Sequence, residues 1–290
     1  MTIKVAAAQY DISFLESFEN YQTKIEGWVC EAAGQNANIL VFPEYASLEL
    51  ASLFPKDIYS SLEKQLVALQ SLLADYISFF QTLAQKYHCC IQAGTFPVRQ
   101  ESGDYRNRAY LFMSDGRYDY QDKLQMTRFE NEQWLIKSGA ELKCFDTEYG
   151  KIAISICYDS EFPLLARKQA EAGAVLILVP SCTDTLAGYH RVKIGCQARA
   201  LENQCYVVQS PTVGNAPWSQ AVDVNIGAAA IYTPVDRGFP DDGIAALGEL
   251  NQNQWVFAEL SLANIEAVRT QGQVFNYKDW PLQQRFLGVL

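Results

Sequence analysis

Cys157 stands in the stretch ISICYDSEFP, where an apolar run ends at a cysteine and acidic, turn-forming residues follow at once. A buried strand is expected to reach the surface here and to pass into a helix. The free N–H groups and the positive dipole end of a helix N-terminus favour the thiolate form of a cysteine. Cys157 is therefore a candidate nucleophile; the alternatives are a small core residue, a metal ligand or one half of a disulfide.

Three further polar side chains stand at or just beyond the end of an apolar strand, where α/β folds usually place their sites. Glu44 follows ILVFP, Lys123 follows YDYQD and Thr183 follows LILVPSC. The flanking Phe42 and Tyr45 are expected to raise the pKa of the Glu44 carboxyl towards neutrality, as a general base requires. The alternative readings are a solvated turn residue for Glu44 and a surface charge for Lys123.

A cysteine nucleophile needs a base, and the chain has only two histidines. His88 lies at the end of an expected amphipathic helix and is interpreted as structural. His190 stands early in another expected helix, so a Cys-His pair with Cys157 is one possible arrangement. The carboxylate of Glu44 is the preferred base.

Composition excludes several classes of protein. The net charge of -10 and the lack of a basic run argue against a nucleic-acid binder. No apolar stretch approaches the ~18 residues of a membrane span, and MTIKVAAAQYD is typical of a first strand rather than of a secretory signal. A cytoplasmic protein without a membrane partner is expected. The eight cysteines form no CxxC pair or Cys/His cluster, so neither a metal site nor a cofactor is predicted.

Strand and helix patterns alternate along the chain, and no repeat or flexible linker divides it. Several strands are almost continuously apolar, which indicates an α/β domain with both faces of its sheet structure covered, while hairpins make the sheets mixed. The predicted helices are 15–33, 70–87, 163–172 and 188–204. The predicted strands are 3–10, 37–44, 89–96, a hairpin at 106–124, then 151–157, 174–181, 205–210, 226–234, 243–250 and 254–260.

Taken together, these stretches resemble the nitrilase superfamily of carbon-nitrogen hydrolases. Its Glu-Lys-Cys motifs are matched by ILVFPEYASL, YQDKLQMTRFE and KIAISICYDSEFPLLAR, in that order. VAAAQYD, GAVLILVPS and ARALENQCYVVQSPTVG match further segments, so the resemblance runs from about residue 3 to residue 262.

The resemblance implies an αββα sandwich, two mixed sheets flanked by helices, often paired into homodimers or higher homo-oligomers. It implies a carbon-nitrogen hydrolase domain at 1–265 and a C-terminal extension at 266–290 that packs on the domain or on a partner subunit. Cys157 would attack an amide or nitrile carbon and form a thioester. Glu44 would move the protons, and Lys123 with the backbone N–H of Tyr158 would stabilise the oxyanion.

Members of the superfamily often carry a second glutamate that orients the lysine and the substrate. The expected pattern is a glutamate, then an aromatic residue, then a glycine. ENEQWLIKSG fits this pattern from Glu132, with Trp134 and Gly139 behind it. Glu132 is therefore predicted as the supporting catalytic residue, with Glu130 as the alternative.

The form CYDSEFP resembles the amidase-like branches, so a small-molecule amide (an amidase, omega-amidase or N-carbamoyl substrate) is favoured over a nitrile. Tyr45, Trp134 and Tyr158 are predicted pocket walls, and Thr183 begins a segment along one side. Arg128 and Arg191 are candidates for binding a substrate carboxylate.

Other matches are expected to be structural: Arg167, Glu202 and Asn203 would hold helices near the cysteine, and Asp159 would fix the turn that carries it. The competing class is a non-catalytic scaffold or binding relative.

Overall fold

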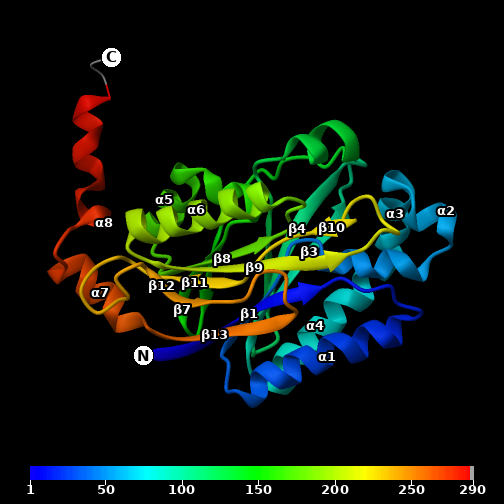
Figure 1. Cartoon of the computed structure of the whole chain (residues 1–290), viewed down its shortest axis with the longest axis horizontal. Coiled ribbons are helices and arrows are strands. Elements are labelled where there is room, and N and C mark those ends of the chain that lie inside the picture. The colour runs from blue at the N-terminus through cyan, green and yellow to red at the C-terminus, as the bar shows by residue number, and fades with distance from the viewer. Residues whose placement is uncertain (288–290) are drawn as a thin grey trace.

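In the computed structural model, which describes residues 1–287, two mixed β-sheets lie face to face and helices cover the outer side of each (Figure 1). The two sheets join where the end of β1 (Thr2–Asp11) runs parallel to the end of β9 (Tyr206–Asn215), with Tyr10 opposite Thr212 and Asp11 opposite Val213. In each sheet the central strands are parallel and the outer strands antiparallel. The expected αββα arrangement of two mixed sheets is confirmed.

Neighbouring strands within each sheet are often distant in the sequence. From one edge to the other, the first sheet consists of β13 (Gln254–Ser261), β1 (Thr2–Asp11), β2 (Ile39–Phe42), β3 (Cys90–Arg99), β4 (Tyr105–Phe112) and β5 (Tyr118–Asp122). The second sheet consists, in the same way, of β6 (Cys144–Thr147), β7 (Gly150–Ile154), β8 (Leu176–Ser181), β9 (Tyr206–Asn215), β11 (Ala230–Tyr232) and β12 (Ile244–Leu247), and β10 (Val224–Asn225) also pairs with β9.

Successive side chains of β1 pack into two different hydrophobic clusters. Val5 and Ala7 belong to the cluster that also contains Ile154 of β7 and Leu178 of β8. Ala6, Ala8 and Tyr10 belong to the cluster that contains the buried faces of two helices, α1 (Phe18–Gly34) and α4 (Leu73–Tyr87). Because side chains alternate across a strand, a strand buried on both faces must be apolar at nearly every position.

The covering helices are α1 (Phe18–Gly34) and α4 (Leu73–Tyr87) on the first sheet, and α5 (Pro163–Glu171) and α6 (Leu186–Asn203) on the second (Figure 1). All four lie where helices are predicted. Residues 46–69 carry elements that the sequence pattern did not predict: η1 (Ala46–Leu53), α2 (Lys56–Tyr59) and α3 (Leu62–Leu69). Each is shorter than the stretch over which helical periodicity becomes distinctive. The first turn of the predicted helix 70–87 is the separate 3₁₀ element η2 (Gln70–Leu72).

One helical stretch, Leu62–Tyr87, is long and apolar enough to cross a membrane by length and composition alone. Core helices pass the same test. Here α4 directs Tyr76, Phe80, Leu83 and Ala84 into the core beneath the first sheet.

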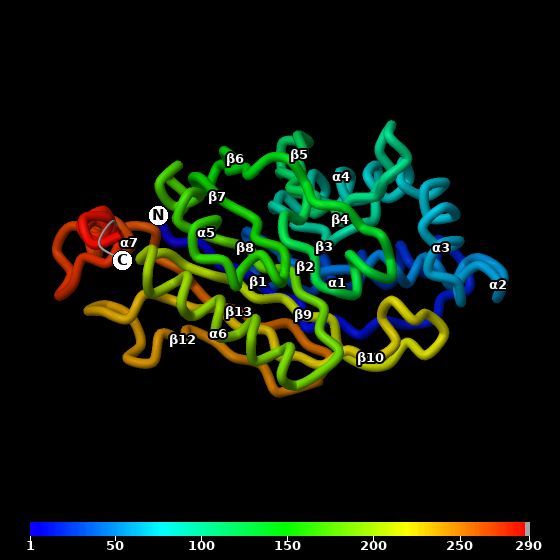
Figure 2. The backbone as a smooth tube through the Cα atoms, turned by 90° about the horizontal axis from the view of Figure 1, so that it is seen from above, coloured from blue at the N-terminus to red at the C-terminus, as the bar shows by residue number. Residues whose placement is uncertain are grey.

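The C-terminal segment lies beside the N-terminus, at the end of the molecule opposite α2 and α3 (Figure 2). It contains α7 (Leu262–Gln271), α8 (Asn276–Asp279) and η5 (Trp280–Phe286). The expected boundary at 265/266 falls inside α7. Tyr277 lies against the guanidinium groups of Arg167 and Arg269 and so ties α8 to the domain. Residues 288–290 of the expected extension lie outside the described part.

A close backbone approach places the segment that carries Glu44. Gly94 in β3 has φ +74°, and a Cβ there would lie 2.3 Å from the carbonyl oxygen of Pro43. Only glycine permits this approach without strain.

We expect Gly94→Ala to lower the free energy of unfolding by about 3 kcal/mol or more, because it adds a backbone clash to an unfavourable φ. The matched control is Gly27→Ala in the exposed part of α1, where an added Cβ meets nothing within 4 Å; it should raise stability by about 0.5–1 kcal/mol. Urea unfolding measures both. Equal effects of the two substitutions would contradict the packing argument.

Candidate active site

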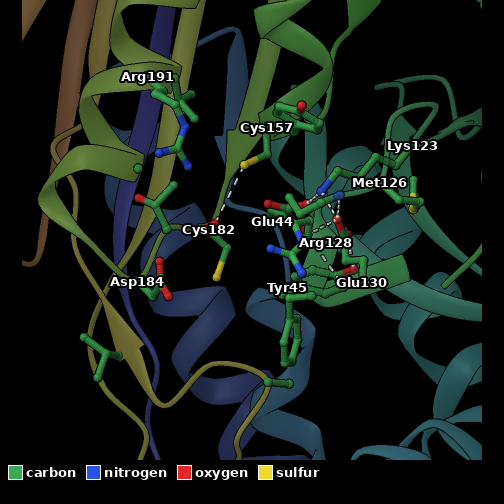
Figure 3. Close-up of a pocket in the computed structure, with 18 of the residues that line it drawn as sticks. Glu44, Tyr45, Lys123, Met126, Arg128, Glu130, Cys157, Cys182, Asp184 and Arg191 are labelled. Carbon is green, nitrogen blue, oxygen red and sulfur yellow. Dashed lines mark hydrogen bonds and ion pairs between the residues drawn. The ribbon is translucent and has the colours of Figure 1, made fainter. Parts of the chain in front are cut away.

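A cavity of about 720 Å³ opens where several strands end, and Glu44, Lys123 and Cys157 line it together (Figure 3). Glu44 lies two residues beyond β2, Lys123 directly follows β5 and Cys157 lies three residues beyond β7. Thr183, two residues beyond β8, lines the same cavity. The strand ends thus bring together side chains that are far apart in the sequence.

Lys123 is almost fully buried and forms two ion pairs. Its Nζ donates to Glu44 Oε1 at 2.8 Å and to Glu130 Oε2 at 2.7 Å. Burial by itself lowers the pKa of Lys123, but the charges of Glu130 and Glu44 outweigh it and raise that pKa well above its usual value. Glu44, Lys123 and Glu130 are called the charge cluster below.

Glu130, and not Glu132, is the second glutamate beside Lys123. Its Oε1 accepts from the Tyr45 hydroxyl at 2.7 Å, and its Oε2 accepts from the backbone N–H and the hydroxyl of Thr127 at 2.9 Å. Burial raises the pKa of Glu130, but Lys123 and these donors bring it below its usual value. Glu132 lies outside the cavity, half exposed, and pairs with Arg128. The prediction that Glu132 is the second glutamate beside Lys123 is therefore wrong.

The reason lies in the short π-helical turn η3 (Glu130–Trp134). Glu130 begins this turn on its buried side, and Glu132, two residues later, faces solvent. Trp134 returns to the buried side but is not a wall of the cavity. Its ring packs on Tyr45, with centroids 4.9 Å apart, and its Nε1 donates to the Leu62 carbonyl. The prediction of Trp134 as a pocket wall is corrected accordingly, whereas Tyr45 and Tyr158 do line the cavity.

Cys157 begins the one-turn helix η4 (Cys157–Glu161) and has φ +48°, which is unusual for a residue with a side chain. Its Sγ lies 3.7 Å from the Cys182 carbonyl oxygen. Burial, and next the charge of Glu44, raise the pKa of the Cys157 thiol well above its usual value, while Lys123 acts in the opposite sense. Burial and Glu44 therefore both act against the helix-stabilised thiolate expected from the sequence, so a nucleophilic role for Cys157 would need a base beside it.

A base is consequently required, and Glu44 lies beside the thiol. Burial raises the pKa of Glu44, Lys123 lowers it and Glu130 raises it, with a net shift upwards. His190 does not line the cavity and is exposed on α6, and His88 ends α4. Among the described residues, the cavity thus places a carboxylate and no imidazole beside Cys157.

Hydrogen bonds between side chains and the backbone hold the segment after Lys123 and the segment after Cys157 in place. Asp159 accepts from the backbone N–H groups of Leu124 and Gln125, directly after Lys123, and burial raises its pKa to about 7. Arg199 donates to the Ser160 carbonyl and pairs with Glu202. These contacts agree with the structural roles expected for Asp159 and Glu202.

The two candidate arginines differ in their surroundings. Arg128 is bound by both oxygens of Glu132, whereas Arg191 has its Nε 3.6 Å from Glu161. In Figure 3 Arg191 lies on the same side of the cavity as Asp184, across from Lys123 and Glu130.

One polar contact was missed by sequence reasoning. Asn107 in β4 is fully buried and donates to both carboxylates of the charge cluster. The strand pattern gave no distinctive signal, because Asn107 stands between Arg106 and Arg108 in the sequence YRNRAYLF. Within residues 1–287, no three His, Cys, Asp or Glu side chains are grouped so that they could hold a metal ion.

We expect Glu130→Gln to lower the free energy of unfolding by about 3 kcal/mol, because it leaves the buried Lys123 with one anionic partner. Glu132→Gln, the matched control, should leave stability nearly unchanged, because its pair with Arg128 is exposed. Urea unfolding at pH 7 measures both. A larger loss for Glu132→Gln would overturn the assignment of Glu130.

Several proteins resemble this chain in sequence. "Probable hydrolase YhcX" of Bacillus subtilis (strain 168) is 39% identical over 96% of this chain and 53% of its own length. "Omega-amidase NIT2" of Bos taurus is 23% identical over 96% and 95%. The match to "Omega-amidase NIT3" of Saccharomyces cerevisiae is 30% identical and covers 46% of this chain and 48% of that protein. The chain thus spans about half the length of several of the curated relatives it matches.

Solved structures share the fold. Saccharomyces cerevisiae Nit3, described as a member of branch 10 of the nitrilase superfamily, matches with a TM-score of 0.75 and 23% identity over 92% of this chain and 93% of its own. A variant of the amidase from Nesterenkonia sp. AN1, with acrylamide added at its active-site cysteine, matches with a TM-score of 0.71 and 18% identity over 98% and 100%. The carbon-nitrogen hydrolase family profile matches residues 4–270. Because that match covers most of the chain, the protein belongs to the carbon-nitrogen hydrolase family.

Proposed function

We propose that the protein hydrolyses an amide bond of a small molecule through an acyl-thioester on Cys157. The observation that carries this proposal is a buried cysteine side chain beside the charge cluster, at a cavity of about 720 Å³. A cavity of this size suits a small molecule. The printed names of relatives, an omega-amidase and an amidase with an adduct on its cysteine, support the same reaction class.

In the acylation step, Glu44 takes the proton of Cys157 as Sγ attacks the amide carbon. The carbonyl π electrons move to oxygen, and the resulting oxyanion is stabilised by Lys123 and by the Tyr158 backbone N–H. Glu44 then gives its proton to the amide nitrogen, the C–N bond breaks, and ammonia or an amine leaves. The acyl group remains on Sγ as a thioester.

In the deacylation step, Glu44 takes a proton from water while the water oxygen attacks the thioester carbon. The C–S bond breaks, a carboxylic acid leaves, and Cys157 recovers its proton from Glu44. A carboxyl whose pKa is raised suits this alternation, because it must both accept and return a proton near neutral pH. Glu130 would keep Lys123 charged and in place.

We propose that the protein is a cytoplasmic homodimer. The free cysteines favour a reducing compartment, and exposed apolar side chains favour association with a second copy. All eight cysteines lie in the described part and are free, including the proposed nucleophile. Leu282, Phe286 and Leu287 at the end of the C-terminal segment are exposed, and a second copy would cover them.

We expect intact-mass measurement to find an acyl adduct when the protein is mixed with a panel of small amides, omega-amides and N-carbamoyl compounds. The adduct should be lost in Cys157→Ala, and Glu44→Gln should lower kcat by about 10²–10⁴-fold, because it removes the base. His190→Ala, the control for a Cys-His mechanism, should leave turnover unchanged.

Ammonia release without an adduct in wild type would indicate fast deacylation, and Glu44→Gln should then stall the reaction. Loss of turnover in His190→Ala with retention in Glu44→Gln would overturn the mechanism. Turnover of nitriles alone would assign the same cysteine chemistry to the other substrate class.

For amides that carry a carboxylate, we expect Arg191→Ala to raise KM by about tenfold, the effect of losing one charge-assisted hydrogen bond. KM for an uncharged amide of similar size should not change. Arg128→Ala is the matched control, because Arg128 is already bound by Glu132. An equal rise in KM for both substrates would show that Arg191 does not bind the substrate carboxylate.

A further inference from the structure

Asn107 is the only uncharged side chain, among the described residues, that bonds to both carboxylates of the charge cluster. Its Nδ2 donates to Glu44 Oε1 at 2.8 Å and to Glu130 Oε1 at 3.2 Å. Its backbone carbonyl accepts from the Lys123 N–H at 2.9 Å. The side chain is fully buried in β4 but does not line the cavity, so it is placed to act on the charge cluster rather than on substrate.

The orientation of the amide is determined by charge. The Oδ1 atom of Asn107 has no hydrogen-bond partner in the described part of the chain. Rotating the amide by half a turn would place this oxygen against two carboxylates and remove both donors, so the observed orientation is the one that the electrostatics select. An unsatisfied buried oxygen costs stability, which the two bonds to carboxylates offset.

These bonds leave the two oxygens of Glu44 in different states. Oε1 accepts from both Lys123 Nζ and Asn107 Nδ2, each at 2.8 Å. Figure 3 shows Glu44 between Cys157 on one side and Lys123 with Glu130 on the other. We propose that Asn107 is a positioning residue that, together with Lys123, engages Glu44 Oε1 and so leaves Oε2 as the atom that takes the proton of Cys157.

A neutral donor is needed at this position for an electrostatic reason. Two carboxylates share one ammonium, so the charge cluster carries one excess negative charge when both are ionised. The titratable groups that face Glu44 are Lys123, Glu130, Cys157, Tyr45 and Cys182. Of these only Lys123 is a cation, and Asn107 adds donors without adding charge. Without them Glu44 would retain a proton to higher pH and could not serve as the base.

The inference rests on the roles proposed for Glu44 and Cys157, but its test needs no amide substrate. Iodoacetamide alkylates a cysteine only as the thiol loses its proton. Where Glu44 takes that proton, the rate follows the ionisation of Glu44 rather than that of the free thiol. The probe is therefore the rate of iodoacetamide alkylation at Cys157 between pH 5 and pH 9, measured by peptide mass spectrometry.

We expect Asn107→Leu to slow alkylation of Cys157 about tenfold at pH 7 and to move the midpoint of its pH dependence upwards by about one unit, the effect of losing one hydrogen bond to a charged acceptor. The matched control is Asn203→Leu. Asn203 is also fully buried, has an unpartnered Oδ1 and donates once, to the Arg199 carbonyl. It should lower stability without moving the midpoint.

A folded Asn107→Leu protein with the wild-type alkylation profile would overturn the proposal, as would an equal shift in Asn203→Leu. If Asn107→Leu does not fold, Asn107→Ala removes the same donors without adding bulk, and its profile decides. If wild type hydrolyses amides but the Asn107 variants leave the alkylation midpoint unchanged, this inference is wrong and the proposed function stands. If the Asn107 variants move the alkylation midpoint but wild type hydrolyses no amide, the proposed function is wrong and the positioning role of Asn107 stands.

Discussion

The buried ammonium of Lys123, shared by two carboxylates, is the interaction around which the whole site is built. Removing three charges from water is costly, and their mutual attraction offsets that cost only when the remaining hydrogen-bonding positions are filled. The structure fills them with the Tyr45 hydroxyl, the Thr127 backbone and hydroxyl, and the Asn107 amide. Each donor comes from a different segment, so the charge cluster exists only when these segments are correctly packed.

Both sheets contribute residues to the site. Glu44, Asn107 and Lys123 belong to the first sheet or to its strand ends, whereas Cys157 and Thr183 follow strands of the second sheet. The bonds from the Leu124 and Gln125 N–H groups to Asp159 join the segment that follows Lys123 to the segment that follows Cys157. The sandwich therefore holds the thiol of Cys157, from one sheet, against the carboxylate of Glu44 and the ammonium of Lys123, from the other.

The distribution of protons follows from burial. Burial raises the pKa of both the Cys157 thiol and the Glu44 carboxyl, so a second negative charge on this pair is energetically unfavourable. Two such coupled groups titrate as a unit. The thiol can remain protected as a neutral group until a substrate carbonyl is present to accept the negative charge that forms.

The fold class, the main strands and covering helices, and the position of the reactive residues at strand ends could all be predicted from the sequence, because these follow from local periodicity and from motif order. That Glu130 enters the charge cluster while Glu132 faces solvent is a result of tertiary packing, since the two are separated by half of one irregular turn. The same packing makes Trp134 support Tyr45 from behind and lets Asn107 bridge two carboxylates. Such contacts join residues far apart in the chain, and local sequence does not encode their geometry.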